Sequence, residues 1–246
     1  VYCWAHPLSG GKQIVCESWR NLISVGAKPI AITNCLNFGS PENEENMGEF
    51  VECVQGLGEA SAYLDFPVVS GNVSFYNGTN NKNIFPTPVI GGVGLIQKLD
   101  KTMNHKFKKE NSNLILIGKT FGHLEQSVFF HEIYSIFEGQ PPEINLVNEK
   151  NNGESVLEII QNKLVRSVHD ISSGGLLVAL AEMCIGGNYG VKVKKPKRLS
   201  NLFEYFFGED QSRYILEIDK NNIEMVEKIL KKNNVFYENI GSTQKE

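Results

Sequence analysis

Residues 26–42 read Gly-Ala-Lys-Pro-Ile-Ala-Ile-Thr-Asn-Cys-Leu-Asn-Phe-Gly-Ser-Pro-Glu, and this stretch decides the fold. Gly26 follows a run of helical periodicity, and Pro29–Thr33 is an apolar run with the length of a short buried strand. Residues 34–42 are mostly polar, which predicts a loop where the strand ends. A helix, a strand and a polar exit loop in this order are the repeating unit of α/β proteins.

The same alternation continues on both sides of this stretch. Apolar periodicity predicts helices at residues 11–25, 44–64, 125–137, 153–163, 176–184 and 222–231. Short apolar runs predict strands at residues 29–33, 67–69, 86–96, 114–118, 164–168, 213–218 and 235–240. The fold class is therefore α/β (α+β), and a lysine-rich, weakly patterned stretch at 98–113 predicts two domains, 1–108 and 109–246.

The composition excludes several classes of protein. Of the 246 residues, 41% are hydrophobic and 21% are charged, as in globular chains with a packed core. The net charge of -4 lacks the basic surplus of a nucleic-acid-binding protein. The five cysteines are scattered, so we expect reduced thiols and a cytoplasmic location rather than disulfides or a zinc site. The apolar runs are too short to span a membrane, so we expect no membrane partner.

Three predicted strand-exit loops share one chemical character, because each combines glycine, Asn or Asp, and hydroxyl side chains. They are Thr33–Gly39, Ser70–Ser74 and His169–Gly175. Ligands of α/β proteins bind beyond the carboxyl ends of strands, where glycine N–H groups reach phosphates and Asn or Asp oxygens suit Mg²⁺. Each loop also has a plainer explanation: Gly-Asn-x-Ser is a common turn, and Ser172 or Ser173 would cap a helix.

Two acidic groupings leave alternatives open. Glu209 and Asp210 fit either a general acid/base pair or a solvated turn, and the residues alone favour the turn. His169 and Asp170 near a serine suggest a catalytic triad. We reject the triad because adjacent residues of a strand point to opposite faces.

Taken together, five phrases closely resemble the second half of formylglycinamidine ribonucleotide synthase. They are residues 26–42, PVVSGNVSFY at 67–76, PTPVIGGVGL at 86–95, HDISSGGLLVALAEM at 169–183 and FGEDQSRY at 207–214. They follow the family's order across nearly the whole chain, and the Leu-Asn-Phe-Gly and Gly-Asn-Val-Ser phrases are specific as a pair. The others recur across the superfamily of aminoimidazole ribonucleotide synthase. The resemblance implies a two-domain unit with mixed β-sheets flanked by helices.

The resemblance also implies an ATP-dependent carbon–nitrogen ligase of purine biosynthesis. In that family ATP and Mg²⁺ phosphorylate the amide oxygen of formylglycinamide ribonucleotide, and ammonia from glutamine displaces the phosphate to form the amidine. The implied partners are the first half of the synthase and a glutaminase subunit with a small bridging subunit, or a fused glutaminase domain. Val1 in place of an initiator methionine indicates a fragment. Because the family's catalytic histidines and acidic Mg²⁺ ligands lie in the first half, we expect the fragment to be inactive alone.

Four positions match the family's binding residues. Asn34 matches an ATP contact that is usually Asp, and Gly71 matches a second ATP contact. Asn72 matches a Mg²⁺ ligand, and Ser74 matches a substrate contact. The neutral amide of Asn34 is a departure, because it binds a metal less well than a carboxylate. The Glu209–Gln211 phrase is implied to face a pseudo-symmetric, non-catalytic site, and no catalytic residue is expected in this chain.

Two further hypotheses belong to other classes. One is a complete homodimeric enzyme of a related superfamily member, either a small-molecule kinase or an aminoimidazole ribonucleotide synthase. It would need acidic metal motifs near the N-terminus, and none are visible. The other is a binding or scaffold module in which a nucleotide serves structure rather than turnover.

Overall fold

The computed structural model describes residues 1–80, 82–194, 196 and 201–245, and it confirms the α/β class. The helices are α1 (Tyr2–Ala5), α2 (Pro7–Ser24), α3 (Glu44–Tyr63), η1 (Leu99–Lys101), η2 (Phe130–Tyr134), α4 (Leu146–Gln161), α5 (Gly175–Gly187), α6 (Leu202–Phe207), η3 (Lys220–Asn222) and α7 (Ile223–Lys232). The strands are β1 (Lys28–Asn37), β2 (Val68–Ser74), β3 (Gly78–Thr79), β4 (Lys82–Asn83), β5 (Thr87–Leu95), β6 (Asn113–Ile117), β7 (Ser167–Asp170), β8 (Gly190–Val193), β9 (Tyr214–Ile218) and β10 (Tyr237–Gln244).

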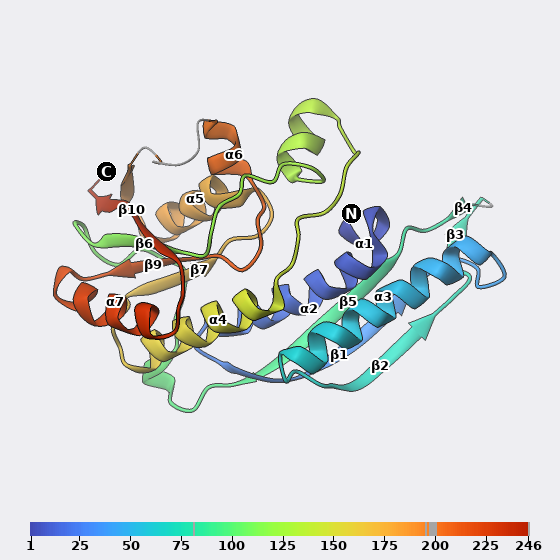
Figure 1. Ribbon diagram of the computed structural model, residues 1–246, viewed down its shortest axis with the longest axis horizontal. Helices are drawn as coiled ribbons and strands as arrows, with labels where there is room; N and C mark the ends of the chain where they lie inside the picture. The colour runs from blue at the N-terminus through green and yellow to red at the C-terminus, as the bar shows by residue number, and fades with distance from the viewer. Residues whose placement is uncertain (81, 195, 197–200, 246) are drawn as a thin grey trace.

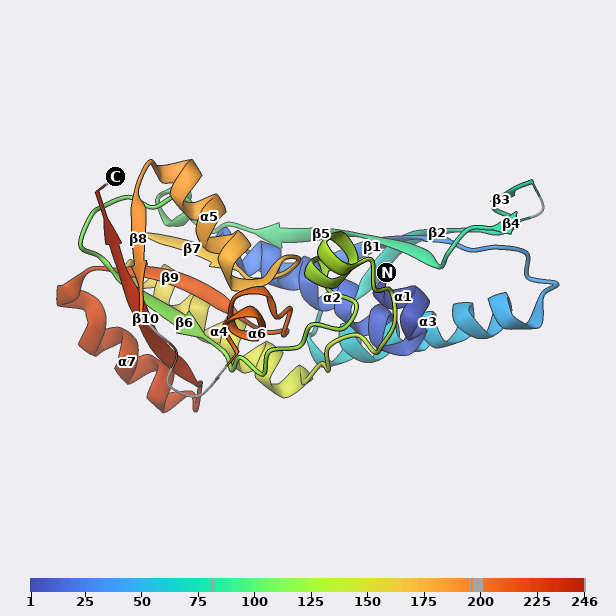
Figure 2. The same cartoon turned by 90° about the horizontal axis from the view of Figure 1, so that it is seen from above.

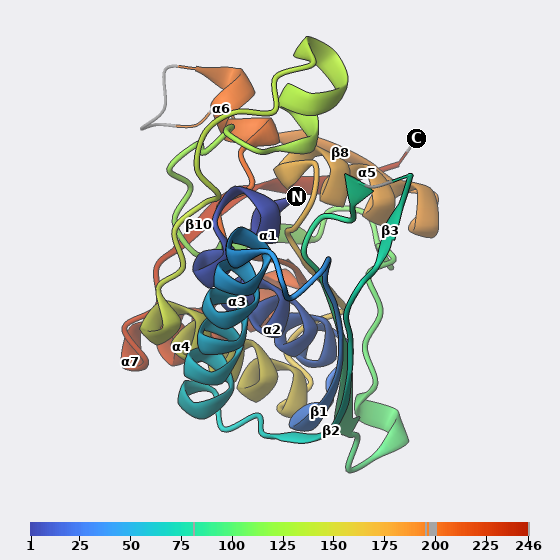
Figure 3. The same cartoon turned by 90° about the vertical axis from the view of Figure 1, so that its right-hand side faces the viewer.

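The first sheet is mixed and has the order β2-β1-β5. β1 pairs with β2 in parallel and with β5 in antiparallel orientation. Figure 3 shows α2 and α3 together on one side of this sheet. Both helices have a defined start, because Pro7 occupies the first turn of α2 and the Asn43 side chain accepts from Asn46 N–H in α3. The other face, which we call the open sheet face, is covered by no described helix.

The second sheet has the order β7-β9-β6-β10-β8, and all its described pairings are antiparallel. Its central strand β6 is buried on both faces. Ile115 and Ile117 pack into a core with α4 and α7, whereas Leu114 and Leu116 pack into a second core with α5 and α6. This alternation follows from the two-residue period of a strand. Figure 1 shows the resulting layers of helix, sheet and helix.

The two sheets share one hydrophobic core. α2 and α4 pack against each other between the sheets, as Figure 1 shows. Trp19 of α2 belongs to the same buried cluster as Ile32 of the first sheet and Tyr214 of the second. A Cβ at Gly153 of α4 would lie 2.1 Å from the Trp19 ring, so only glycine allows this approach. The proposed domains 1–108 and 109–246 are therefore not independent in their packing.

Several predicted elements differ from the observed ones. The predicted helix at 125–137 is too long, because only residues 128–134, which include the η2 turn, are helical there. Gln126 and Ser135 adopt left-handed φ values of 58° and 54°, which interrupt any α-helix across this segment. The predicted helix at 153–163 begins earlier, because the Asn145 side chain accepts from Asn148 N–H and starts α4. The helix predicted at 44–64 is confirmed as α3.

No described helix is long and apolar enough to cross a membrane. Figure 2 shows the second sheet at one end of the molecule and the β3–β4 hairpin at the other.

Candidate functional site

The first two predicted exit loops are strands in the structure, which corrects the prediction. β1 continues through Asn37, and β2 extends through Ser74. Parallel pairing of residues 33–37 with residues 70–74 supplies partners for the backbone groups of both segments. The polar side chains were read as loop residues, but they stand on a paired sheet. Asn34, Gly71, Asn72 and Ser74 are therefore held on rigid strands.

The four predicted site residues divide between the two faces of the first sheet. Asn34 and Gly71 are register partners on the side that faces α2 and α3, because they share the parity of buried Ile32 and Leu36. A Cβ at Gly71 would lie 2.0 Å from Asn34 Oδ1, so the glycine leaves room for that side chain. The predicted ATP contacts are thus adjacent to each other.

Asn72 and Ser74 stand on the open sheet face. Asn72 pairs with Cys35 and Ser74 pairs with Asn37 across the parallel ladder. The Ser74 hydroxyl donates to Asn77 Oδ1 at 3.2 Å, which fixes the hydroxyl where β2 ends. The predicted metal ligand and substrate contact are therefore on the opposite face from the predicted ATP contacts.

The residues around Asn72 do not form a metal site by themselves. The paired side chain of Cys35 is uncharged, and among the described residues no group of three His, Cys, Asp or Glu is arranged to hold a metal ion. Mg²⁺ binds through carboxylates, phosphates and water, and a neutral amide supplies at most one weak ligand. Any further protein ligands would have to come from outside this face.

The open sheet face is unusually apolar for a solvated surface. Ile30, Val89 and Val93 project from it, and each of these side chains is about half exposed. They form a row beside the polar end that carries Asn72. A row of exposed apolar side chains beside polar ones is typical of a surface that is buried in a larger assembly.

At the third predicted loop, His169–Gly175, a side chain of the protein itself binds a backbone N–H group. Glu209 is 2% exposed, and its Oε1 accepts from Gly174 N–H and Val128 N–H, both at 2.8 Å. Its Oε2 accepts from the Tyr2 hydroxyl. Burial raises the pKa of Tyr2, and the neighbouring Glu209 charge raises it further. The solvated turn predicted at Glu209 and Asp210 is wrong, because these carboxylates are buried acceptors of backbone hydrogen bonds.

The start of α5 corrects a second expectation. Neither Ser172 nor Ser173 caps the helix, because Gly174 is the N-cap residue and no side chain of its own makes a cap bond. Gly174 and Gly175 have φ values of 81° and 71°, which other residues rarely adopt. The Glu209 carboxylate therefore supplies the negative charge at this helix N-terminus.

Asp210 is satisfied in the same way. Its Oδ2 accepts from Phe121 N–H and Gly122 N–H, both at 2.9 Å, and its Oδ1 accepts from His123 N–H at 3.3 Å. Arg213 lies 3.9 Å from the same carboxylate. Asp210 is thus a structural anion rather than a general acid or base.

A buried ion pair joins the two sheets. Arg20 Nη1 donates to Glu149 Oε1 at 2.9 Å and to Oε2 at 3.0 Å. Arg20 Nη2 also donates to Gln211 Oε1 at 2.9 Å. Burial raises the pKa of Glu149, and Arg20 offsets part of that rise. The Glu209–Gln211 phrase therefore contacts α1 and α2 through Tyr2 and Arg20.

His169 has no serine partner among the described hydrogen bonds. Its Nε2 lies 2.8 Å from Glu182 and its Nδ1 lies 3.5 Å from Asp170. Burial lowers the pKa of His169, but the two carboxylates outweigh it and raise the pKa. The missing serine partner is consistent with the rejection of a triad, but the contact with Asp170 shows that the opposite-face argument for it was wrong.

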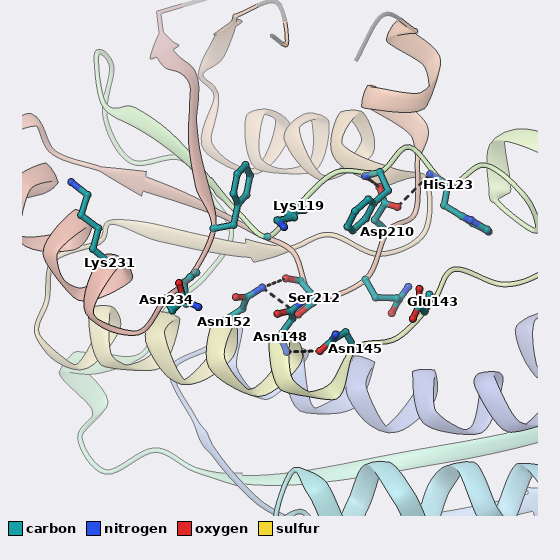
Figure 4. A pocket seen from close by; sticks show the side chains of 15 residues that line it. Lys119, His123, Glu143, Asn145, Asn148, Asn152, Asp210, Ser212, Lys231 and Asn234 are labelled. Atoms are coloured by element: carbon teal, nitrogen blue, oxygen red, sulfur yellow. Dashed lines mark hydrogen bonds between the residues drawn. The ribbon is translucent and has the colours of Figure 1, made fainter. Parts of the chain in front are cut away.

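A cavity of about 870 Å³ lies at one end of the second sheet. Figure 4 shows that its side chains come from α4, α7 and the ends of β6, β9 and β10. Its polar lining includes Lys119, Asn145, Asn148, Asn152, Ser212 and Asn234. Asn152 Nδ2 donates to Ser212 O at 2.8 Å. The lining residues lie in four stretches, 118–123, 143–152, 210–212 and 231–236, so the pattern of a single stretch could not predict the cavity.

The fold and the paired domains place the chain in a known class of proteins. Residues 1–96 match the N-terminal domain of AIR synthase related proteins, and residues 109–246 match the C-terminal domain. The chain belongs to the AIR synthase related family.

Among curated relatives, the chain is similar to the phosphoribosylformylglycinamidine synthase subunit PurL of Pelagibacter ubique. They are 65% identical over 98% of this chain and 33% of the relative. The PurL subunit of Rhodopseudomonas palustris is 47% identical over 98% of this chain and 33% of its own length. The chain therefore spans about a third of the length of these relatives.

Solved structures share the fold. Thermotoga maritima PurL complexed with FGAR has a TM-score of 0.79 and 20% identity, over 98% of this chain and 40% of that chain. The protein tt0281 from Thermus thermophilus has a TM-score of 0.73 and 19% identity, over 98% of this chain and 77% of that chain.

Proposed function

We propose that this chain is the second two-domain unit of an ATP-dependent ligase of purine biosynthesis. The reaction converts formylglycinamide ribonucleotide and ammonia, derived from glutamine, to formylglycinamidine ribonucleotide through a phosphorylated amide. The observation that carries the proposal is the 65% identity to a PurL subunit across 98% of this chain. PurL of Thermotoga maritima has been solved with ATP and with FGAR, and in a PurLQS assembly.

The open sheet face supports the need for a partner unit. Asn72 stands on this face opposite Cys35, and Ile30, Val89 and Val93 on the same face are exposed to water. A second unit of the same class would bury these apolar side chains and bring acidic ligands for Mg²⁺ toward Asn72. The partner unit also supplies the catalytic groups, so this chain provides one wall of the site and is inactive alone.

The proposed role of each predicted residue follows from the family resemblance. Asn34 and Gly71 contact ATP, Asn72 binds Mg²⁺ and Ser74 contacts the substrate. Asn34 and Gly71 lie on one face of the sheet, and Asn72 and Ser74 lie on the other. A bound ATP must therefore lie at the end of β1 and β2 to contact both pairs. A glutaminase subunit and a small bridging subunit, or a fused glutaminase domain, supply the ammonia in the cytoplasm.

A chimera tests the proposal. The matching third of the Pelagibacter ubique PurL subunit is replaced by this chain, and amidine formation is measured with ATP, Mg²⁺ and ammonia. We expect turnover by the chimera and none by the isolated chain. Turnover by the isolated chain would refute the need for a partner unit.

Within the chimera, Asn72→Ala is expected to lower kcat/KM at least about tenfold, or roughly 1.4 kcal/mol in the barrier. Asn113→Ala is the matched control, because Asn113 lies on the second sheet and pairs with Asn239. Unchanged kinetics in Asn72→Ala would remove that residue from the site.

A further inference from the structure

An exposed apolar cluster lies on the second sheet's side of the molecule, away from the open sheet face. We call it the aromatic patch, and it consists of Phe121, Ile133, Tyr134, Phe137, Leu202 and Phe203. All six side chains are exposed, from 48% for Leu202 to 73% for Phe121. Figure 1 shows η2 and α6 at the top of the view, whereas β1 and β2 lie at the bottom. A partner on the open sheet face would leave this patch uncovered.

Ring contacts connect two of the patch residues, Tyr134 and Phe203, through Phe129. The Phe129 ring lies 5.6 Å from Phe203, 4.5 Å from Phe207 and 5.5 Å from Tyr134, measured between centroids. The rings of Phe129 and Phe207 stack on each other and connect the η2 segment to α6. Contiguous apolar surface of this kind on a water-soluble domain marks a site of protein association.

The two sequence segments that carry the patch are acidic. Residues 120–149 and 201–212 contain no lysine or arginine. Glu132 and Glu138 flank the patch on the η2 segment, and Glu204 lies on α6 between Phe203 and Tyr205. These acidic residues favour a partner whose apolar surface is bordered by lysine or arginine. They disfavour a second copy of this chain, because its patch carries the same charges.

The described backbone around the patch favours a helix rather than a strand as the binding partner. The described residues 119–145 and 201–213 include no strand, so an added strand would find no ladder to extend. A helix satisfies its own backbone and needs only side-chain contacts. We propose that the aromatic patch binds a basic amphipathic helix of a partner protein. This inference does not depend on the proposed ligase function.

Two synthetic peptides test the proposal by fluorescence anisotropy with the full chain. Both are helical peptides with the same leucine face, and the remaining positions are lysine in one and glutamate in the other. We expect the lysine peptide to bind at least about tenfold more tightly, with an advantage that shrinks at high salt. Equal affinity of the two peptides would overturn the proposal, as would binding to neutral phosphatidylcholine vesicles in place of either peptide.

Variants locate the binding. Tyr134→Ser combined with Phe203→Ser is expected to weaken the lysine peptide at least about tenfold, whereas Met225→Ser on α7 should change nothing. Met225 is a matched control because it is 57% exposed, close to the 55% of Phe203. Glu132→Lys combined with Glu138→Lys should reverse the preference between the peptides. Equal losses in Met225→Ser and in the double variant would overturn the proposal.

The chain's own basic residues before α6 provide a final arm. Lys197 and Arg198 lie outside the described residues. Lys197→Gln combined with Arg198→Gln is expected to leave the affinity of the lysine peptide unchanged. A tenfold gain in affinity would show that this segment already contacts the acidic residues beside the patch, which would overturn the proposal.

Discussion

Asn34 and Gly71 form the closest contact between two predicted site residues. The missing Cβ at position 71 is what allows Asn34 Oδ1 to lie over β2. The atom that a new Cβ would meet is the end of a movable side chain, so a larger residue at 71 displaces Asn34 more than it strains the backbone. The pair therefore offers a way to move one predicted ATP contact without unfolding the sheet.

Gly71→Ala is expected to raise the KM for ATP about tenfold in the chimeric ligase, the size of one lost hydrogen bond, with little change in Tm. Steady-state kinetics and thermal denaturation check the two parts. Gly58→Ala is the control, since nothing lies within 4 Å of its added Cβ. It should leave KM unchanged and stabilise α3 by about 0.5–1 kcal/mol. An unchanged KM in Gly71→Ala would argue against an ATP contact at Asn34.

At the scale of single elements, Glu209 determines how α5 begins. A buried carboxylate with two N–H donors and one hydroxyl donor replaces the serine cap that the sequence suggested. The same carboxylate holds the segment before η2 through Val128. The α5 start and the loop that leads to η2 are therefore stabilised by one side chain from a third segment.

Glu209→Gln is expected to destabilise the chain by about 1–3 kcal/mol, because a neutral amide loses the charge-assisted character of the hydrogen bonds from Val128 N–H and Gly174 N–H. Urea denaturation gives the free energy of unfolding. Glu204→Gln is the conservative control on nearby α6, where the carboxylate accepts a hydrogen bond from Asn201. Similar stability losses in both variants would contradict the special role of Glu209.

How much of this was predictable differs from element to element. α3 was predicted within a residue, because its apolar stripe and the Asn43 cap are local signals. The error at residues 125–137 arose because left-handed backbone at Gln126 depends on contacts with Phe137 and Gly139. Polar residues of β1 and β2 were read as loops because pairing between strands is not visible in one segment. The positions of Asn34 and Asn72 along the chain were predictable, but their opposite faces were not.

For the whole molecule, the shared core makes the two sheets one folding unit. Trp19, Ile32 and Tyr214 lie in a single buried cluster, and the Arg20–Glu149 ion pair crosses the same boundary. Contacts of this kind couple the unfolding of both parts. Family models divide the chain in two, but its packing does not.

Glu149→Ala is expected to lower the stability of the whole chain by about 3–5 kcal/mol, because it leaves Arg20 buried without its partner. Tryptophan fluorescence and far-UV circular dichroism should report the same single transition. Asp100→Ala, which breaks the exposed pair with Lys163, should leave the midpoint unchanged. Two separated transitions in Glu149→Ala would contradict the shared core.

Strand β2 has a further consequence for handling the chain. It lies at the edge of the first sheet, and six of its seven residues are exposed, including Val68, Val69 and Val73. An exposed edge strand rich in valine is a template with which other extended chains can pair. β2 contains no proline or lysine that would prevent this pairing. We therefore expect aggregation through this edge, rather than loss of the folded state, to set the concentration limit of the isolated chain.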